Sequence, residues 1–217
     1  MKEEKDSTYY DELFESRANY KKTYKESYYW VHWTQVIKFL GKDKNQKILE
    51  IGCGTGQLTE YLLDETFKNY VGFDFSTKAI EIAKKQLPDS TFFEGDALAK
   101  SSYDIEYDTV ICLEVLEHVT RDLDIIQNIE TGKTIIFSVP NFWDPSHVRI
   151  FNSERAIKKR YFTLIDIQAI VRVGNIYIAK GTRSDFKPNL LQSFLKSRET
   201  VNVSSFIKRI KHRLDKL

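Results

Sequence analysis

A glycine-rich turn after a short apolar strand is the first place where this chain could bind a ligand. Residues 48–51 have the composition of a buried parallel strand, and glycines follow at alternate positions, Gly52, Gly54 and Gly56. The next residues, 57–63, have the pattern of a helix. A strand, a glycine turn and a helix N-terminus together bring backbone N–H groups up to a bound ligand.

The glycine spacing, together with the acid that precedes it, favours a ligand with a positively charged end. The pattern is G-x-G-x-G, whereas turns that bind a pyrophosphate have G-x-G-x-x-G. Glu50 stands two residues before Gly52, where a carboxylate would repel a pyrophosphate and attract a cation. Taken alone, the motif also fits an ordinary strand-to-helix turn.

Two more acids follow predicted strands. Asp74 ends the second strand, 22 residues after Gly52, where a carboxylate accepts hydrogen bonds from a ribose diol. The alternative is a helix cap, but Ser76 or Thr77 already fills that position. Gly95-Asp96-Ala97 leaves the third strand, and by itself this turn carries little information.

A fourth strand runs into Glu114-Val115-Leu116-Glu117-His118-Val119. With this segment and the three turns in register, residues 47–140 resemble the class I S-adenosylmethionine-dependent methyltransferases. The resemblance is greatest to the small-molecule group that includes ubiquinone-biosynthesis O-methyltransferases and sugar or lipopolysaccharide methyltransferases.

The resemblance implies S-adenosyl-L-methionine as methyl donor and S-adenosyl-L-homocysteine as product. It implies that the Asp96 side chain binds the adenine amine and the Ala97 N–H a ring nitrogen. The reaction would be in-line attack of an acceptor oxygen or nitrogen on the sulfonium methyl, which mainly requires positioning and desolvation. The implied cofactor-binding residues are Glu50, Gly52, Cys53, Gly54, Gly56, Asp74, Phe75, Asp96, Ala97, Leu113 and Glu114.

A hydroxyl acceptor also needs a general base, and His118 and His147 are the candidates. A second interpretation makes the same residues metal ligands. Glu114, Glu117 and His118 are spaced as one face of a helical turn, and His147 completes a set suited to Mg²⁺, Mn²⁺ or Zn²⁺. The small-RNA 2′-O-methyltransferases use such a set, but their further histidine motif is absent here. A metal-dependent RNA methyltransferase and a non-catalytic cofactor-binding scaffold are therefore the alternative functions.

Two aromatic segments are expected to form the acceptor site. The loop 142–151 follows the fifth strand at the edge of the sheet where ligands bind. Tyr20, Tyr24 and Tyr28 are four residues apart, which predicts one face of a helix that packs on the sheet or closes over a ligand as a lid. The predicted acceptor contacts come from Tyr10, Tyr20, Tyr24, Asn141, Trp143 and Arg149.

An α/β fold has to position all of these residues. We expect a Rossmann-like, doubly wound, mostly parallel seven-stranded sheet with helices on both faces and an antiparallel last strand. The expected parts are an aromatic, helical N-terminal cap or lid (1–46), the cofactor-binding core (47–181) and a basic amphipathic C-terminal extension (182–217).

Composition narrows the partners. The chain has 217 residues, 41% of them hydrophobic, and a net charge of +2, which argues against a surface that tracks nucleic acid. The charged start, the two isolated cysteines and the lack of a long apolar run favour a cytoplasmic enzyme. The expected partner is a small-molecule, sugar or lipid-linked acceptor. The basic extension could contact a membrane surface or RNA, or dock on the domain or on a second subunit, so monomer and homodimer both remain open.

Overall fold

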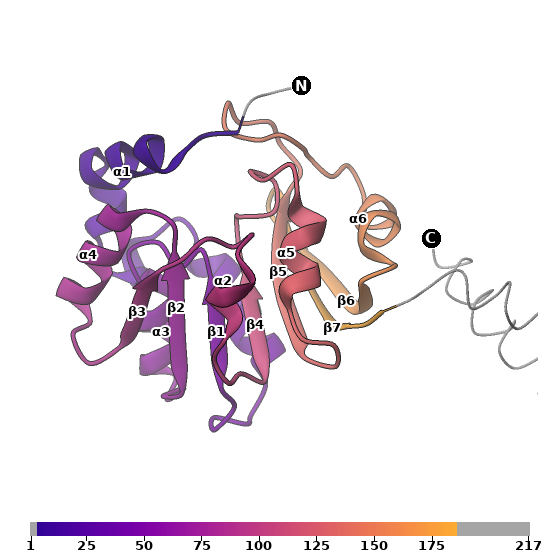
Figure 1. The fold of residues 1–217 in the computed structure, drawn as a ribbon, viewed down its shortest axis with the longest axis horizontal. Helices are drawn as coiled ribbons and strands as arrows, with labels where there is room; N and C mark the ends of the chain where they lie inside the picture. The colour runs from indigo at the N-terminus through magenta and orange to yellow at the C-terminus, as the bar shows by residue number, and fades with distance from the viewer. Residues whose placement is uncertain (1–3, 186–217) are drawn as a thin grey trace, which may run out of the picture.

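A seven-stranded sheet organises the computed structural model, which describes residues 4–185 (Figure 1). The strands lie in the order β3-β2-β1-β4-β5-β7-β6. β1 to β5 are parallel, whereas β7 pairs antiparallel with both β5 and β6. This confirms the predicted sheet. The strands are β1 (Ile48–Ile51), β2 (Tyr70–Asp74), β3 (Thr91–Glu94), β4 (Thr109–Cys112), β5 (Thr134–Pro140), β6 (Ile165–Val173) and β7 (Ile176–Arg183).

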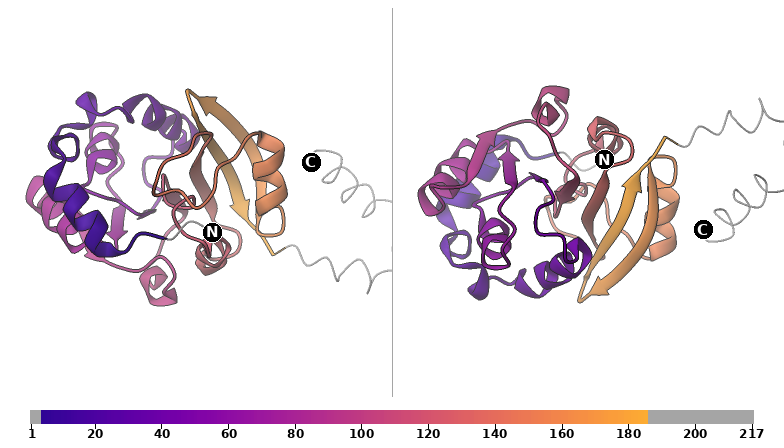
Figure 2. Two further views of the ribbon diagram at one scale, coloured as in Figure 1. Left: turned by 90° about the horizontal axis from the view of Figure 1, so that it is seen from above. Right: turned by 90° about the horizontal axis from the view of Figure 1, so that it is seen from below.

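Helices cover both faces of the sheet (Figure 2). Alternate residues of each buried strand point to opposite faces, so Ile48 and Ile111 join one core while Leu49 and Val110 join the other. The first core is completed by α2, α3 and α4, and the second by η3, α5 and α6. The helices are α1 (Ser7–Ser16), α2 (Trp30–Leu40), α3 (Gln57–Asp64), α4 (Thr77–Gln86), α5 (Asp122–Asn128) and α6 (Glu154–Tyr161), with short 3₁₀ turns η1 (Ala18–Lys21), η2 (Tyr24–Glu26) and η3 (Lys100–Tyr103).

The N-terminal segment differs from the prediction. Residues 20–28 do not form a helix; the two 3₁₀ turns η1 and η2 replace it. Tyr24 is buried against α3, where its hydroxyl donates to Asp64 Oδ2 at 2.7 Å and its ring stacks on Tyr61. Tyr28 is 71% exposed. Because the chain folds back onto α3, the regular spacing of the tyrosines does not place them on one face.

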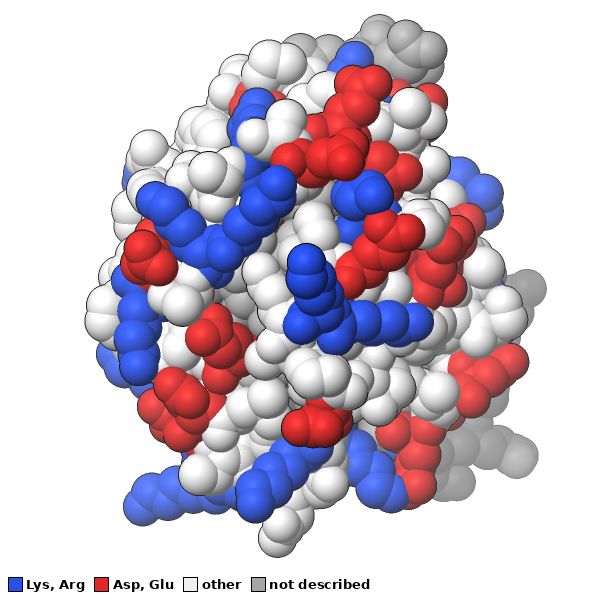
Figure 3. Space-filling view, turned by 90° about the vertical axis from the view of Figure 1, so that its left-hand side faces the viewer, with Lys and Arg blue, Asp and Glu red and all other residues white. Residues whose placement is uncertain are grey.

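Most of the predicted basic extension, including its apolar stripe at Ile207, Ile210, Leu214 and Leu217, lies outside the described residues. Within residues 4–185, no helix has the length and apolar character needed to cross a membrane. On the face that carries α1 and α4, acidic and basic side chains are interspersed, in line with the nearly balanced charge of the chain (Figure 3).

A buried ionic cluster joins the second core to the loop after β5. Asp122 is fully buried at the start of α5, and it pairs with Arg160, with Arg149 at 3.3 Å and with the hydroxyl of Tyr161 at 2.8 Å. Arg160 and Tyr161 are neighbours in α6, whereas Arg149 lies in the loop after β5. The cluster therefore ties α5 to α6 and to the loop after β5.

We expect Asp122→Ala to lower the free energy of unfolding by about 3 kcal/mol, because it leaves two arginines without their buried counterion. Urea denaturation would measure the change. The matched control is Asp124→Ala, which breaks a more exposed pair with Arg121 and should cost less than about 1 kcal/mol. Equal effects of the two substitutions would contradict the importance given to the buried cluster.

Candidate functional site

A cavity of about 760 Å³ opens at the carboxyl ends of the central strands. Its floor comes from the turns after β1, β2 and β3 and from the end of β4. Its walls come from α1, the start of α2 and the loop after β5, and Figure 1 shows α1 and this loop over the same edge of the sheet. The volume lies in the range of about 300–1,000 Å³ that is usual for small-molecule sites.

The glycine turn has the conformation that its sequence requires. Gly52, Gly54 and Gly56 all have positive φ, at 71°, 52° and 83°. The N–H groups of Gly52 and Cys53 both donate to the carbonyl of Phe73, at 2.8 and 3.0 Å, which fastens the turn to the end of β2. A side chain at Gly52 would collide with Val115 in the segment after β4. The turn therefore lies pressed between two neighbouring strands.

Asp74 links the first two turns. Its Oδ2 accepts from the N–H of Gly54 at 2.9 Å, and its Oδ1 accepts from the N–H of Ser76 at 2.9 Å. Burial raises the pKa of Asp74 to about 6, although these backbone donors oppose the shift. Because a carboxylate oxygen accepts more than one hydrogen bond, the group can still bind a diol in the cavity that it lines.

Glu50 supplies the second buried acid, and its environment includes two residues that the sequence did not single out. The hydroxyl of Tyr70 donates to Glu50 Oε2 at 2.6 Å. Gly72 makes this bond possible, because a side chain there would collide with that hydroxyl. Burial raises the pKa of Glu50 to about 8. A ligand with a positive end would stabilise the ionised form of this carboxyl.

Most of the other residues predicted to bind the cofactor line the cavity. Asp96 accepts from the N–H of Leu98 at 2.8 Å and lies at the cavity wall. Gly56 is the exception, because it begins α3 and faces Phe92 and Leu87 instead of the cavity. The predicted residues that line the cavity are Glu50, Gly52, Cys53, Gly54, Asp74, Phe75, Asp96, Ala97, Leu113 and Glu114.

His118 and His147 line the cavity, and with Glu117 they form a cluster in which one ligand atom from each residue lies within 4.8 Å of the others. His118 Nδ1 lies 3.1 Å from the Ser146 carbonyl, and His147 Nδ1 lies 3.1 Å from the Phe142 carbonyl. Because a carbonyl only accepts, each neutral imidazole carries its proton on Nδ1 and its lone pair on Nε2.

The third member of this cluster is a carboxyl without hydrogen-bond partners. Glu117 is fully buried, and neither of its side-chain oxygens has a partner among the described residues. Its Oε1 lies 3.9 Å from His118 Nε2. Burial raises the pKa of Glu117 well above its usual range and lowers that of His118 to about 4. Two buried groups and the partly buried His118 thus bring potential ligand atoms together, and a cation there would stabilise the ionised form of Glu117.

Glu114 does not belong to this cluster, so the alternative interpretation that Glu114, Glu117 and His118 share one face of a helical turn is wrong. The residue has φ +54°, which is uncommon for a residue other than glycine, and the chain forms no helix there. The hydroxyl of Ser138 donates to Glu114 Oε1 at 2.6 Å, and Ser138 Oγ in turn accepts from the backbone N–H of Glu114 at 2.8 Å. Glu114 therefore stays at the cavity wall, held by β5.

The segment after β4, which carries His118, and the loop after β5, which carries His147, hydrogen-bond to each other and so hold both histidines in place. The N–H of Val148 donates to the carbonyl of Glu117 at 2.8 Å. Arg149 donates to the carbonyl of Leu116, to that of Val119 at 2.6 Å and to that of Thr120 at 2.9 Å. The prediction that Arg149 binds the acceptor is wrong, because its guanidinium is occupied by these carbonyls and by the buried ionic cluster.

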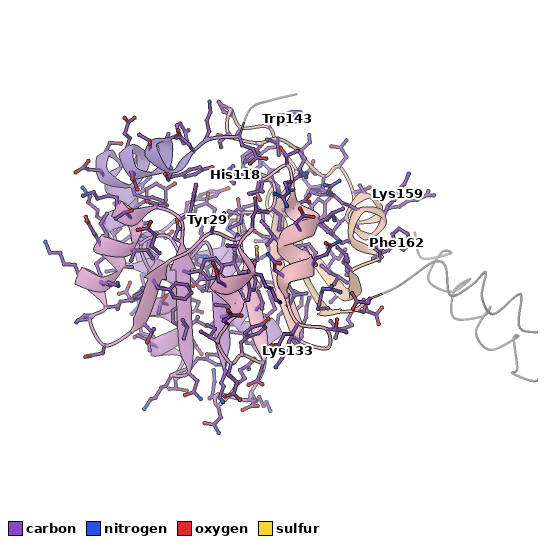
Figure 4. The ribbon with its side chains drawn as sticks, viewed as in Figure 1. Tyr29, His118, Lys133, Trp143, Lys159 and Phe162 are labelled. Carbon is purple, nitrogen blue, oxygen red and sulfur yellow. The ribbon has the colours of Figure 1, made fainter. Side chains whose placement is uncertain are left out.

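Three other predicted acceptor residues also lie outside the cavity lining. Tyr24 is in the core beside α3, so that prediction is wrong. Asn141 does not line the cavity, and its N–H donates to the Asn175 carbonyl. Trp143 is 57% exposed and lies at the outer rim of the molecule, above His118 (Figure 4). Tyr20 does line the cavity, and so do Tyr9, Tyr10, Phe14, Tyr29 and Trp33.

The cap is fastened to the turns that form the cavity floor. On α1, Asp11 Oδ1 accepts from the Ser76 hydroxyl at 2.5 Å and from the N–H of Lys78 at 3.1 Å. Thr55, in the glycine turn, donates its hydroxyl to the Tyr20 carbonyl at 2.7 Å. The cap and the floor are thus parts of one hydrogen-bonded unit.

Comparisons with known proteins show which proteins this chain is similar to in sequence and in fold. Residues 49–131 match a family model described as a methyltransferase domain. An uncharacterized methyltransferase of Oceanobacillus iheyensis is 31% identical over 114 residues, 52% of this chain, and the chain spans half of that protein's length. A ubiquinone biosynthesis O-methyltransferase of Hydrogenovibrio crunogenus is 27% identical over 187 residues, 77% of each protein.

Among solved structures, the magnesium protoporphyrin IX methyltransferase of Synechocystis PCC 6803 with bound S-adenosylhomocysteine has a similar fold. The TM-score is 0.63 at 20% identity, over 82% of this chain and all of that one.

We expect Asp74→Ala to weaken S-adenosylhomocysteine binding at least about tenfold, because hydrogen bonds to a charged group are worth about 1.5–3 kcal/mol each. Calorimetric titration would measure this, with Asp89→Ala, an exposed acid outside the cavity, as the control. The affinity of the unmodified protein should also fall as the pH drops through 6, where Asp74 gains a proton. Unchanged binding by Asp74→Ala would refute the ribose assignment.

Proposed function

Because the chain belongs to the class I S-adenosylmethionine-dependent methyltransferases, we propose that it transfers a methyl group to a hydroxyl, or to an amine, of a small-molecule acceptor. The observation that carries the proposal is the arrangement of one cavity. Two acids suited to the donor, Glu50 and Asp74, and two histidines that could serve an acceptor, His118 and His147, all line this one cavity.

The acids and the glycine turn would bind the methyl donor, and the histidines would take part in the reaction. Asp74 and the glycine turn would bind the ribose, Asp96 the adenine amine, and Glu50 the positively charged end of the donor. This binding would direct the methyl group past Leu113 and Glu114 toward the histidines. A neutral sulfide leaves without help, so the protein mainly orients the two reactants and excludes water.

His147 and His118 would serve the acceptor. Because Nδ1 of each lies at a backbone carbonyl, Nε2 is the atom that would take a proton from a hydroxyl as it attacks the methyl carbon. The low pKa of His118 keeps this imidazole neutral at physiological pH. His118 and His147 stand 4.9 Å apart between ring centroids, so one acceptor group could be within reach of both.

The cavity walls favour an acceptor with a flat or ring-shaped body. Tyr9, Tyr10, Tyr20, Tyr29 and Phe142 supply aromatic surface beyond the donor-binding turns. The Hydrogenovibrio relative is named an O-methyltransferase, which supports a hydroxyl acceptor over an amine. Sugars and lipid-linked molecules that carry a ring and a hydroxyl are also candidate acceptors.

We further propose that residues 1–46 act as the cap and that the enzyme works in the cytoplasm, where its two free, buried cysteines would stay reduced.

The cluster of Glu117, His118 and His147 supports a second candidate, a metal-dependent form of the same transfer. The partnerless carboxylate of Glu117 and the two Nε2 lone pairs would hold a divalent cation. Such an ion would act as a Lewis acid on the acceptor oxygen and lower its pKa. In that case the histidines would be ligands instead of bases, and the more acidic acceptor hydroxyl would give its proton to solvent water.

The test of the proposed function combines binding with turnover. We expect the unmodified protein to bind S-adenosylhomocysteine and to transfer tritium-labelled methyl groups to hydroxylated ring compounds. His147→Ala should lower turnover at least about tenfold while S-adenosylhomocysteine binding persists, because His147 lies at the acceptor end. Full activity of this variant would remove His147 from the mechanism, and absence of S-adenosylhomocysteine binding by the unmodified protein would refute the proposal.

The metal candidate has a readout that does not depend on activity. If the cluster binds a divalent ion, Mn²⁺ should raise the melting temperature of the unmodified protein, because an ion that binds only the folded state stabilises it. Glu117→Gln should abolish the shift. Glu114→Gln should retain it, since Glu114 bonds to Ser138 instead. No shift with Mn²⁺, Mg²⁺ or Zn²⁺ in the unmodified protein would leave the histidines as bases.

A further inference from the structure

Tyr10 places a buried hydroxyl at the acceptor end of the cavity. The residue belongs to α1 and lines the cavity from the cap. Its ring contacts the ring of His118 at 5.9 Å and that of Phe75, the residue after Asp74, at 5.3 Å between centroids. Its oxygen is inaccessible to solvent and has no hydrogen-bond partner among the described residues. Burying a hydroxyl in this way is unfavourable, so it calls for an explanation.

The neighbouring polar groups do not satisfy this hydroxyl. Ser146 is near enough to influence the pKa of Tyr10, but the two side chains do not reach hydrogen-bonding geometry, and Ser146 Oγ donates to Asp144 Oδ1 at 2.6 Å. Glu117, which also acts on the pKa of Tyr10, has no partner for its own oxygens. Burial is the main cause that raises the pKa of Tyr10, so the phenol remains a hydrogen-bond donor.

A molecule bound among these residues would meet one hydrogen-bond donor, Tyr10, and several hydrogen-bond acceptors. Tyr10 offers a hydrogen, whereas His118, His147 and Glu117 offer lone pairs. A hydroxyl that is about to be methylated gives its proton to a base and uses a lone pair to attack. A hydrogen bond from Tyr10 to that same oxygen would withdraw electron density from it. The productive partner of Tyr10 is therefore a second oxygen of the same acceptor.

We propose that Tyr10 is an acceptor-binding residue that selects molecules with an oxygen next to the hydroxyl that is methylated. The inference rests on the proposed function and adds the acceptor class. The phenol of Tyr10 donates to this second oxygen, while the reacting hydroxyl faces the histidines. The cap then does more than cover the donor, because it reads the acceptor directly.

A matched pair of probes tests this. 2-Methoxyphenol has an ether oxygen beside its hydroxyl, and 2-ethylphenol replaces that oxygen with a methylene of similar size. We expect the enzyme–S-adenosylhomocysteine complex to bind 2-methoxyphenol roughly tenfold more tightly, which is the effect of one hydrogen bond. The preference should also appear in kcat/KM for methyl transfer. Tyr10→Phe should abolish it by weakening the binding of 2-methoxyphenol alone.

Two controls separate acceptor binding from a structural role. Tyr28→Phe, in an exposed tyrosine of the same cap outside the cavity, should keep the preference. Tyr10→Phe should melt at or above the temperature of the unmodified protein, because it removes a hydroxyl that has no partner to lose. S-adenosylhomocysteine binding should be the same in all three proteins.

Several results would overturn the inference and leave the proposed function intact. These are a preference that survives in Tyr10→Phe, no preference in the unmodified complex, and failure of that complex to bind either probe while it still binds S-adenosylhomocysteine. A lower melting temperature of Tyr10→Phe with an unchanged preference would show a structural hydroxyl instead. Loss of S-adenosylhomocysteine binding in the unmodified protein would refute the proposed function itself.

Discussion

The mutual hydrogen bonding of two irregular segments holds the cluster of Glu117, His118 and His147 in place. The segment after β4 carries Glu117 and His118, and the loop after β5 carries His147. Neither segment has regular secondary structure that would fix its side chains. Instead, the backbone carbonyls of the first segment accept from Arg149 and Val148 of the second, and His118 donates to the carbonyl of the loop in return. Buried backbone groups must find such partners, so this pairing fixes where the imidazoles lie.

Burial disfavours the ionised form of several acids around the cavity, and a bound ligand with a positive charge would stabilise that form. Glu50, Asp74 and Glu117 are each nearly or fully buried, and desolvation raises the pKa of all three. The first two are partly compensated, by a tyrosine hydroxyl and by backbone N–H groups. Glu117 is compensated least. Charged or polar groups that are left unsatisfied in a folded protein are commonly kept because a ligand or an ion completes them.

The cap depends on the same turns that form the floor. Asp11 bonds to the beginning of α4 directly after Asp74, and Thr55 of the glycine turn bonds to the cap at Tyr20. The N-terminal segment also supplies much of the aromatic wall of the cavity. These hydrogen bonds therefore hold the aromatic wall and the turns of the floor in one arrangement.

The sequence alone determined the architecture and the turns at the strand ends that line the cavity. Apolar runs, glycine spacing and acids at strand ends are local signals, and parallel strands bring their carboxyl ends to one edge whatever the details of packing. Strand ends such as Asp74 and Asp96 were therefore predictable. Which polar side chains face the cavity was decided only by the tertiary structure. The side chain of Arg149 hydrogen-bonds to distant backbone carbonyls. Likewise, Tyr24 bonds to Asp64, Glu114 to Ser138 and Tyr70 to Glu50. Each outcome depended on which partner from a remote segment satisfied a buried polar group, and that information is not contained in local spacing.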